Sequence, residues 1–371
     1  MRTGLPLDGL VVVAIEQAVA APFCSSRLAD AGARVIKVER PEGDFARGYD
    51  DVAAGGQSSY FVWLNCGKES MVVDLSAQGG RDRLRALIAR ADILIQNLKP
   101  GVLARLGLGV EDFCRAHPRL IACSISAYGE TGPLASRKAY DLLIQAESGL
   151  ASVTGGPDEP ARVGISVVDI ATGATAHAAI LEALIARGLT GQGADIRVSM
   201  FDVMADWLTV PLLHQEGGRP PNRVGLAHPS IAPYGVFGTR DGGRILISIQ
   251  RDREWAKFCA VFLRDAAAAQ DPRFATNVAR TRNRAETDAR VGRVFADLSG
   301  EEAVARLTQA DVAFASVNDM AALANHPHLR RISVETPGGP VAFPAPAAIV
   351  RGVPRGYGPV PGLGACRGDE T

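Results

Sequence analysis

Asp169 is the residue whose surroundings best support chemistry. It ends the apolar run Val163–Val168 and begins a segment, Asp169–Arg187, in which apolar residues recur at helical spacing. A carboxylate at a helix start meets backbone N–H groups that lack partners within the helix. Such donors favour the ionised carboxylate and could stabilise an oxyanion on a bound substrate. An ordinary N-cap, worth about 1 kcal/mol, is the alternative, and local sequence alone favours it.

Other reactive side chains form no comparable pattern. The six histidines lack triad-like spacing, and the six cysteines include no CxxC pair and no zinc spacing. His326 and His328 flank a proline with no acidic neighbour, which predicts an exposed loop rather than a metal site. The sequence contains no Walker loop, HExxH or GxSxG motif. We therefore expect no bound metal.

Composition narrows the class of protein. The 371 residues carry 40 Lys+Arg and 40 Asp+Glu, giving zero formal charge, and 47% are hydrophobic. These values exclude a disordered polyelectrolyte and a strongly basic nucleic-acid binder. The apolar run Leu10–Ile15 is too short for a membrane span, and we expect no membrane partner. Scattered cysteines in a chain of this length favour reduced thiols, so we expect a cytoplasmic protein.

The first half of the chain alternates short β-branched runs with Ala-rich helical stretches. This pattern predicts an α/β fold with a parallel sheet and right-handed crossovers, whose ligand lies at the carboxyl ends of the strands. The expected strands are Leu10–Ile15, Arg34–Val38, Met71–Leu75, Ile93–Gln96, Leu120–Ser124 and Ala194–Val198, and the expected helices are Pro22–Gly32, Gly80–Ala91, Val110–His117 and Phe201–Leu213.

The second half predicts a smaller α+β domain over 226–324. The segment 217–225 (GGRPPNRVG) has the composition of a linker. Gly235–Thr239 and Arg244–Ile249 flank a turn sequence and predict a hairpin. Helices are expected over Glu254–Leu263 and Ala285–Leu307, and the final thirty residues are rich in proline and glycine and predict no helix.

A set of short motifs follows one another in order along most of the chain. They are GARVIKVERPEGDFAR (32–47), LNCGKES (64–70), NLKPG (97–101), RLGL (105–108), AYGETGP (127–133), KAYD (138–141), SGL (148–150), VDIATG (168–173), GQG (191–193), VSMFD (198–202) and HPSIAPY (228–234). This ordered set resembles the class III CoA-transferase family, also called the CaiB/BaiF or formyl-CoA transferase family, which includes an α-methylacyl-CoA racemase branch. The resemblance covers roughly residues 5 to 365. It implies a Rossmann-like large domain over 1–216, completed by about 325–371, a smaller domain, and an interlocked ring homodimer.

The resemblance implies a covalent mechanism on coenzyme A substrates. Asp169 would attack an acyl-CoA to give a mixed anhydride and then an aspartyl-CoA thioester, with a small mono- or dicarboxylic acid as acceptor. Succinyl-CoA is one candidate donor. Ser76 stands where the family can have a CoA-contacting lysine. The positions implied to contact CoA are Ala18, Val19, Ala20, Arg40, Val73, Asn97, Leu98, Arg105 and Lys138.

Three further residues are candidates for the acid substrate. Arg47 is a candidate cation for a distal carboxylate, and Tyr140 and Asp141 are expected near the reacting groups. In the racemase branch a histidine base occupies the place of Tyr140, and a phenol with an ordinary pKa near 10 is a poor base. Transfer is therefore favoured. An acyl-CoA racemase and a catalytically silent acyl-CoA-binding protein remain as alternatives.

Overall fold

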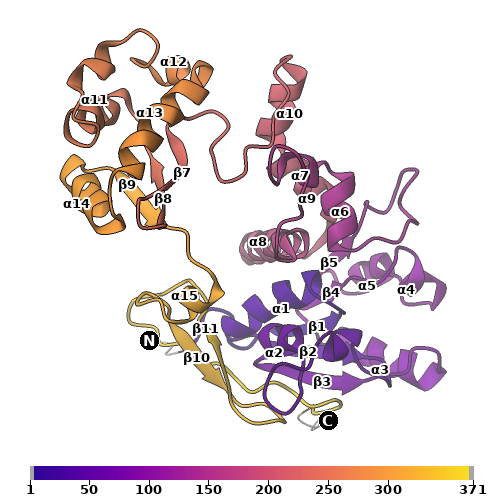
Figure 1. Cartoon of the computed structure of the whole chain (residues 1–371). Coiled ribbons are helices and arrows are strands. Elements are labelled where there is room, and N and C mark those ends of the chain that lie inside the picture. The colour runs from indigo at the N-terminus through magenta and orange to yellow at the C-terminus, as the bar shows by residue number, and fades with distance from the viewer. Residues whose placement is uncertain (1–3, 367–371) are drawn as a thin grey trace. The chain divides into compact units, whose positions relative to one another are not determined.

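The computed structural model describes residues 4–366. Contacts divide the described chain into two compact units (Figure 1). The first contains residues 4–150, 162–212 and 330–366, and the second contains 151–161 and 213–329. The chain therefore leaves the first unit and returns to it twice.

A six-stranded parallel sheet forms the centre of the first unit, which confirms the predicted mixed α/β fold. The strand order is β3-β2-β1-β4-β5-β6, so the direction of winding reverses between β1 and β4. The third strand begins at Lys68, three residues before the predicted start. The sequence placed the start too late because Lys68 is a charged residue, whereas in the fold its ammonium is buried and paired with Glu16 at 2.7 Å. The strands are β1 (Val11–Ile15), β2 (Arg34–Glu39), β3 (Lys68–Val72), β4 (Ile93–Gln96), β5 (Ile121–Ser126) and β6 (Ala194–Ser199).

Helices cover both faces of this sheet. Successive side chains of β1 therefore point into two different cores, one on each face. Val12 and Ala14 belong to the core that contains α1 and α8, whereas Val13 and Ile15 belong to the core that contains α3 and α5. The helices of this unit are α1 (Ala20–Asp30), η1 (Phe45–Gly48), α2 (Ser59–Asn65), α3 (Gln78–Ile88), α4 (Val102–Arg105), α5 (Val110–Ala116), α6 (Asp141–Glu147), α8 (Val167–Thr190) and α9 (Met200–Trp207). Two more, α7 (Leu150–Val153) and α10 (Thr209–Glu216), contain residues of both units.

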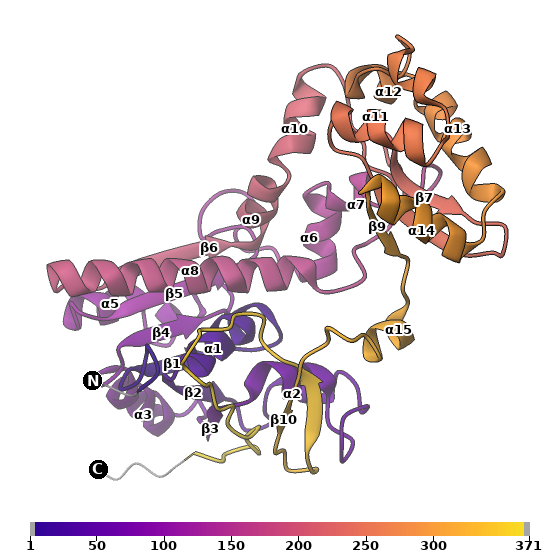
Figure 2. The ribbon, with the colours of Figure 1, turned by 90° about the vertical axis from the view of Figure 1, so that its left-hand side faces the viewer.

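Helix α8 is the longest element, and Figure 2 shows it along its length beside α1. Among the described residues it is the one helix long and apolar enough, by length and composition, to cross a membrane. Val168, Ala176 and Ile180 from one of its faces pack in the core that covers the sheet. The run 163–166 before the helix is irregular and not a strand. The helix begins after Ser166, so Asp169 is the third helical residue rather than the N-cap.

The second unit contains an antiparallel sheet and a helical layer. β7 (Tyr234–Gly238) pairs with β8 (Arg244–Ser248), as the hairpin prediction requires, and β8 also pairs with β9 (Ala313–Ser316). The expected helix over 285–307 is interrupted, because the Ser299 side chain accepts the Glu302 N–H and starts a new helix. The helices are α11 (Asp252–Val261), η2 (Ala266–Gln270), α12 (Asn277–Arg282), α13 (Arg284–Ala296), α14 (Gly300–Ala310) and α15 (Met320–Ala324).

The last described residues complete the first unit. The hairpin of β10 (Arg331–Val334) and β11 (Val341–Pro344) shares a small core with Phe61 and Val62 of α2. Beyond it, Pro359 accepts the Gly67 N–H at 2.9 Å and Ala365 accepts the Ser70 N–H at 3.1 Å. This segment therefore lies along β3, at the edge of the parallel sheet.

Candidate active site

A cavity of about 650 Å³ opens at the carboxyl ends of three neighbouring strands of the first unit. Its wall includes Gln17–Ala20 after β1, Asn97–Pro100 after β4 and Ile125–Ala127 at the end of β5. This edge contains the point where the winding of the sheet reverses, which is where α/β sheets bind their ligands. Residues from η1, α2, the start of α6 and the start of α8 complete the wall.

Asp169 lines this cavity from the first turn of α8. Burial raises the pKa of the Asp169 carboxyl to about 7, and the negative charge of Asp141 adds to the rise. An ionised carboxylate held there is poorly solvated and needs no base to act as a nucleophile. The arrangement thus favours bond formation at Asp169 once the side chain is deprotonated.

The segment after β1 is held in a strained conformation beside this carboxylate. Ala18 has a φ of 63°, in the left-handed region that a side chain disfavours. Its N–H donates to Asp44 at 3.2 Å, and Asp44 is itself paired with the buried Lys37 ammonium at 2.8 Å. Asn97 binds the N–H and the carbonyl of Gln17 at 3.0 and 2.9 Å. These contacts fix the backbone where α1 begins.

Two tyrosines form part of the wall that sequence reasoning did not identify. The Tyr49 and Tyr60 rings meet edge to face with centroids 5.5 Å apart, and the Tyr60 hydroxyl lies 3.5 Å from Ser166 Oγ. Burial, then the charges of Asp44 and Asp169, raises the pKa of Tyr49 to about 12, so it remains a neutral hydroxyl. No local pattern signals either residue, because both depend on how η1 and α2 fold over the sheet. Gln17, Arg162 and Ser166 were also not anticipated.

The cavity gathers most of the residues expected from the sequence. Four others lie outside its wall: Arg47, described below, and three of the positions expected to contact CoA. Arg40 follows β2, is exposed, and donates to the Gly43 carbonyl at 2.9 Å; Val73 follows β3 and is buried in the core; Arg105 is the last residue of α4. The residues gathered are Asp169, Ala18, Val19, Ala20, Asn97, Leu98, Lys138, Tyr140 and Asp141.

Arg47 is not among the cavity residues. Its guanidinium donates to both Glu39 oxygens, at 2.7 and 2.9 Å, and lies 3.8 Å from the centre of the Phe61 ring. Glu39 is buried, so this pair fastens η1 to the sheet and leaves no free fork for a substrate. Arg162, an exposed cation on the segment before α8, lines the cavity instead. The Arg162 guanidinium donates to the Gly164 carbonyl at 3.4 Å.

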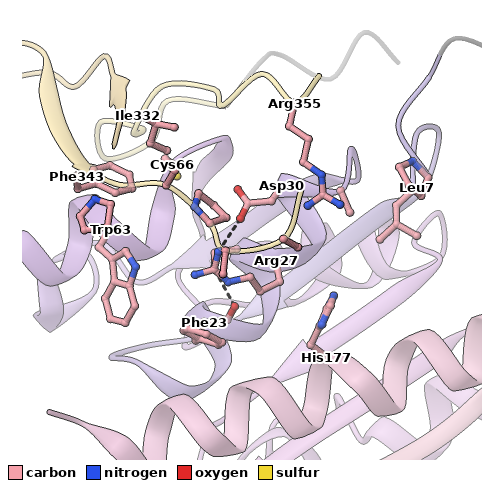
Figure 3. Close-up of a pocket in the computed structure, with 18 of the residues that line it drawn as sticks. Leu7, Phe23, Arg27, Asp30, Trp63, Cys66, His177, Ile332, Phe343 and Arg355 are labelled. Carbon is pink, nitrogen blue, oxygen red and sulfur yellow. Dashed lines mark hydrogen bonds and ion pairs between the residues drawn. The ribbon is translucent and has the colours of Figure 1, made fainter. Parts of the chain in front are cut away.

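A second cavity, of about 590 Å³, lies in the same unit (Figure 3). Phe23, Trp63 and Phe343 give it apolar walls, and Arg27 pairs there with Asp30 at 2.9 Å. Its wall contains none of the residues that the sequence singled out for catalysis or CoA binding. Across residues 4–366, no three His, Cys, Asp or Glu side chains gather as a metal site requires.

Comparisons with known proteins show which family the chain resembles along most of its length. The model of CoA-transferase family III matches residues 7–365. An acetyl-CoA:oxalate CoA-transferase from Acetobacter aceti is 37% identical, covering 91% of this chain and 88% of that protein. A succinate–glutarate CoA-transferase from Agrobacterium fabrum is 39% identical, covering 76% of this chain and 72% of that protein. The crystal structure of a CaiB/BaiF family protein from Brucella suis is 35% identical, with a TM-score of 0.82 and 98% and 97% of the two chains covered.

Proposed function

Since the chain belongs to CoA-transferase family III, we propose that it moves CoA from an acyl-CoA to a small carboxylic acid with Asp169 as nucleophile. The observation that carries the proposal is the Asp169 carboxyl, which lines a cavity at the reversal point of the sheet and has a pKa raised by burial. Such a group becomes a weakly solvated anion near neutral pH.

The proposed reaction has four transfers. An Asp169 oxygen attacks the donor thioester carbonyl, forming a mixed anhydride and expelling CoA thiolate. The thiolate then attacks the aspartyl carbonyl, giving an aspartyl-CoA thioester and releasing the donor acid. The acceptor carboxylate attacks that thioester, forming a second anhydride and freeing the thiolate again. Attack of the thiolate on the acceptor carbonyl yields the new acyl-CoA and restores the Asp169 carboxylate.

We infer that CoA lies along the carboxyl edge of the sheet. Ala18, Arg40, Val73 and Asn97 follow the adjacent strands β1, β2, β3 and β4, so a long ligand on this edge passes all four positions. Lys138 lines the cavity and can pair with a phosphate. The outer positions Arg40 and Arg105 then serve the nucleotide end rather than the reacting end.

For the acceptor, we propose a short dicarboxylic acid bound through Arg162. The relatives from Acetobacter aceti and Agrobacterium fabrum are named for oxalate and for succinate and glutarate. A distal carboxylate needs a cation, and Arg47 is already paired with Glu39. The Arg162 guanidinium lines the Asp169 cavity and suits bidentate carboxylate binding.

Hydroxylamine trapping tests the role of Asp169. The purified protein is incubated with succinyl-CoA and hydroxylamine, and the peptide containing Asp169 is sequenced by mass spectrometry. Either acylated intermediate reacts at the aspartyl carbonyl to leave a hydroxamate on Asp169, and Asp169→Ala must abolish the label while CoA binding persists. Turnover that survives in Asp169→Ala refutes the assignment.

The same incubation, repeated in heavy water, distinguishes two alternatives. A racemase exchanges the α-proton of its acyl-CoA with heavy water and leaves no hydroxamate; the exposed phenol of Tyr140, at the N-cap of α6, is a poor base for that step. A silent acyl-CoA-binding protein gives neither label nor exchange.

We also propose that the protein is an intertwined cytoplasmic homodimer. Its domains would be those expected from the sequence, a large one over 1–216 completed by about 325–371 and a small one over 226–324. The support is the chain path, since 330–366 return to the first unit after the second unit is complete. A stable folded monomer in sedimentation at micromolar concentration contradicts the dimer.

A further inference from the structure

Asp141 makes its contacts with the protein rather than leaving its carboxylate free for a substrate. It is buried at the start of α6, and one of its oxygens accepts the N–H of Val168 at 2.8 Å and the N–H of Asp169 at 3.2 Å. These N–H groups belong to the first turn of α8, where no intrahelical acceptor exists and Ser166 supplies no side-chain cap. Asp141 therefore satisfies the turn that carries Asp169.

The other oxygen of Asp141 is held by Gln145, one turn further along α6. Gln145 Nε2 donates to it at 2.7 Å, and Gln145 Oε1 accepts the Val163 N–H at 2.9 Å. Gln145 is fully buried, so this acid–amide pair ties α6 to the segment before α8 and to α8 itself. All the partners of Asp141 are donors, which suits an ionised carboxylate.

The charge of Asp141 acts on its neighbour. After burial, Asp141 is the group that raises the pKa of Asp169. Tyr49 stays neutral, because its pKa is about 12. The remaining titratable or charged groups around the cavity are Tyr60 of α2, Lys99 after β4, Arg137, Lys138 and Tyr140 before α6, and Arg162 before α8.

We propose, resting on Asp169 as the nucleophile, that Asp141 is a positioning residue that fixes the first turn of α8 and whose negative charge drives Asp169 toward its acylated forms. The anhydride and the thioester carry no charge at residue 169. Each acylation of Asp169 therefore removes the repulsion between two adjacent carboxylates, and each deacylation restores it. A neutral residue at 141 that kept the hydrogen bonds would hold the turn without this bias.

Two variants separate the charge from the hydrogen bonds. Asp141→Asn keeps an oxygen for the α8 N–H groups but turns an amide NH₂ toward Gln145 Nε2. The double variant Asp141→Asn with Gln145→Glu supplies an acceptor to that NH₂ and to the Val163 N–H, so the network is rebuilt with its charge one side chain further from Asp169. Asp319→Asn is the matched control, since Asp319 accepts the Ala322 N–H at 2.8 Å at the start of α15.

The readouts are thermal melting, hydroxylamine trapping, and kcat/KM from pH 5 to 9 with succinyl-CoA and glutarate. We expect Asp141→Asn to lower the pH midpoint of kcat/KM by about one unit, the size of a close charge pair. We also expect it to cut kcat/KM for succinyl-CoA, which reports the acylation of Asp169, about tenfold at pH 8. The double variant should recover the melting temperature of the parent and still show a lowered midpoint, while Asp319→Asn keeps the parent profile.

The outcomes that overturn the proposal are equally defined. A parent midpoint in both variants, with only the melting temperature reduced, assigns Asp141 to structural support. Failure of both variants to fold does the same. Absence of the hydroxamate in the parent protein refutes the nucleophile itself, a separate result from an unmoved pH profile in proteins that are labelled normally.

Discussion

Replacing Asp169 by asparagine should stabilise the fold while abolishing transfer. The carboxyl has a pKa of about 7 in the folded chain against an ordinary 3.8. An acid whose pKa is raised by folding stabilises the fold fully at low pH, and this contribution is lost as pH rises from about 4 to about 7. At 1.36 kcal/mol for each pKa unit, the ionised side chain costs on the order of 4 kcal/mol above that range. The neutral amide has almost the same shape and avoids this cost.

Urea unfolding at pH 5 and pH 8, at one protein concentration, measures the effect. At pH 8 we expect the free energy of unfolding of Asp169→Asn to exceed that of the parent by on the order of 2 to 4 kcal/mol. At pH 5 this difference should be smaller by roughly 2 kcal/mol. Asp202→Asn is the control, because Asp202 is an exposed acid in the first turn of α9. If the gain for Asp169→Asn is the same at both pH values, or no larger than that of the control, then the Asp169 carboxyl does not have the raised pKa and the reasoning fails.

Three further predictions follow from named contacts. Arg162→Gln should raise KM for glutarate about tenfold or more, because the loss of a charged hydrogen bond costs roughly 1.5 to 3 kcal/mol. Hydroxylamine labelling with acetyl-CoA should stay intact. Initial rates with glutarate and with acetate as acceptor measure the difference. Arg47→Ala should cost on the order of 3 kcal/mol in urea unfolding at pH 7, because it removes the ion-pair partner of the buried Glu39 and leaves it only the hydrogen bonds from Ser70 and Asp44. Glu39 has a pKa lowered to about 2 in the fold, so the parent should lose this stability as pH falls from about 4.5 toward 2 and the variant should lose less. Ser299→Ala should cost about 1 kcal/mol by removing the cap of α14, and faster hydrogen exchange in the α14 peptides, with α11 unchanged, is the measurement.

The regular elements of the fold were accessible from the sequence because their signals are local. β4 matches its predicted bounds, since Ile93–Gln96 is a short apolar strand buried on both faces. The interruption after Ala296 was missed, since helical spacing continues through it and only the Ser299 cap marks the break. The hairpin of β10 and β11 was missed because its strands are short and lie in a proline- and glycine-rich region.

The candidate site also contains residues that the local sequence indicates and residues that only the tertiary fold brings in. Asp169 was accessible as a helix-start acid in a family motif, although its neighbour Asp141 and not its own side chain satisfies the turn. Tyr49 and Tyr60 were not accessible, because their approach to Asp169 depends on tertiary packing. The pairing of Arg47 with Glu39, which keeps Arg47 out of the cavity wall, was not accessible for the same reason, since Glu39 becomes its neighbour only once β2 and η1 are placed.

The return of residues 359–366 to β3 has a consequence for biosynthesis. A ribosome delivers the chain from its amino end, so the sheet strands of the first unit emerge long before the segment that hydrogen-bonds to Gly67 and Ser70. The second unit is complete at residue 329, so it can fold before the segment that covers β3 has been synthesised. Until then β3 is an edge strand with unpaired backbone groups, and such edges are sites at which chaperones bind and chains self-associate.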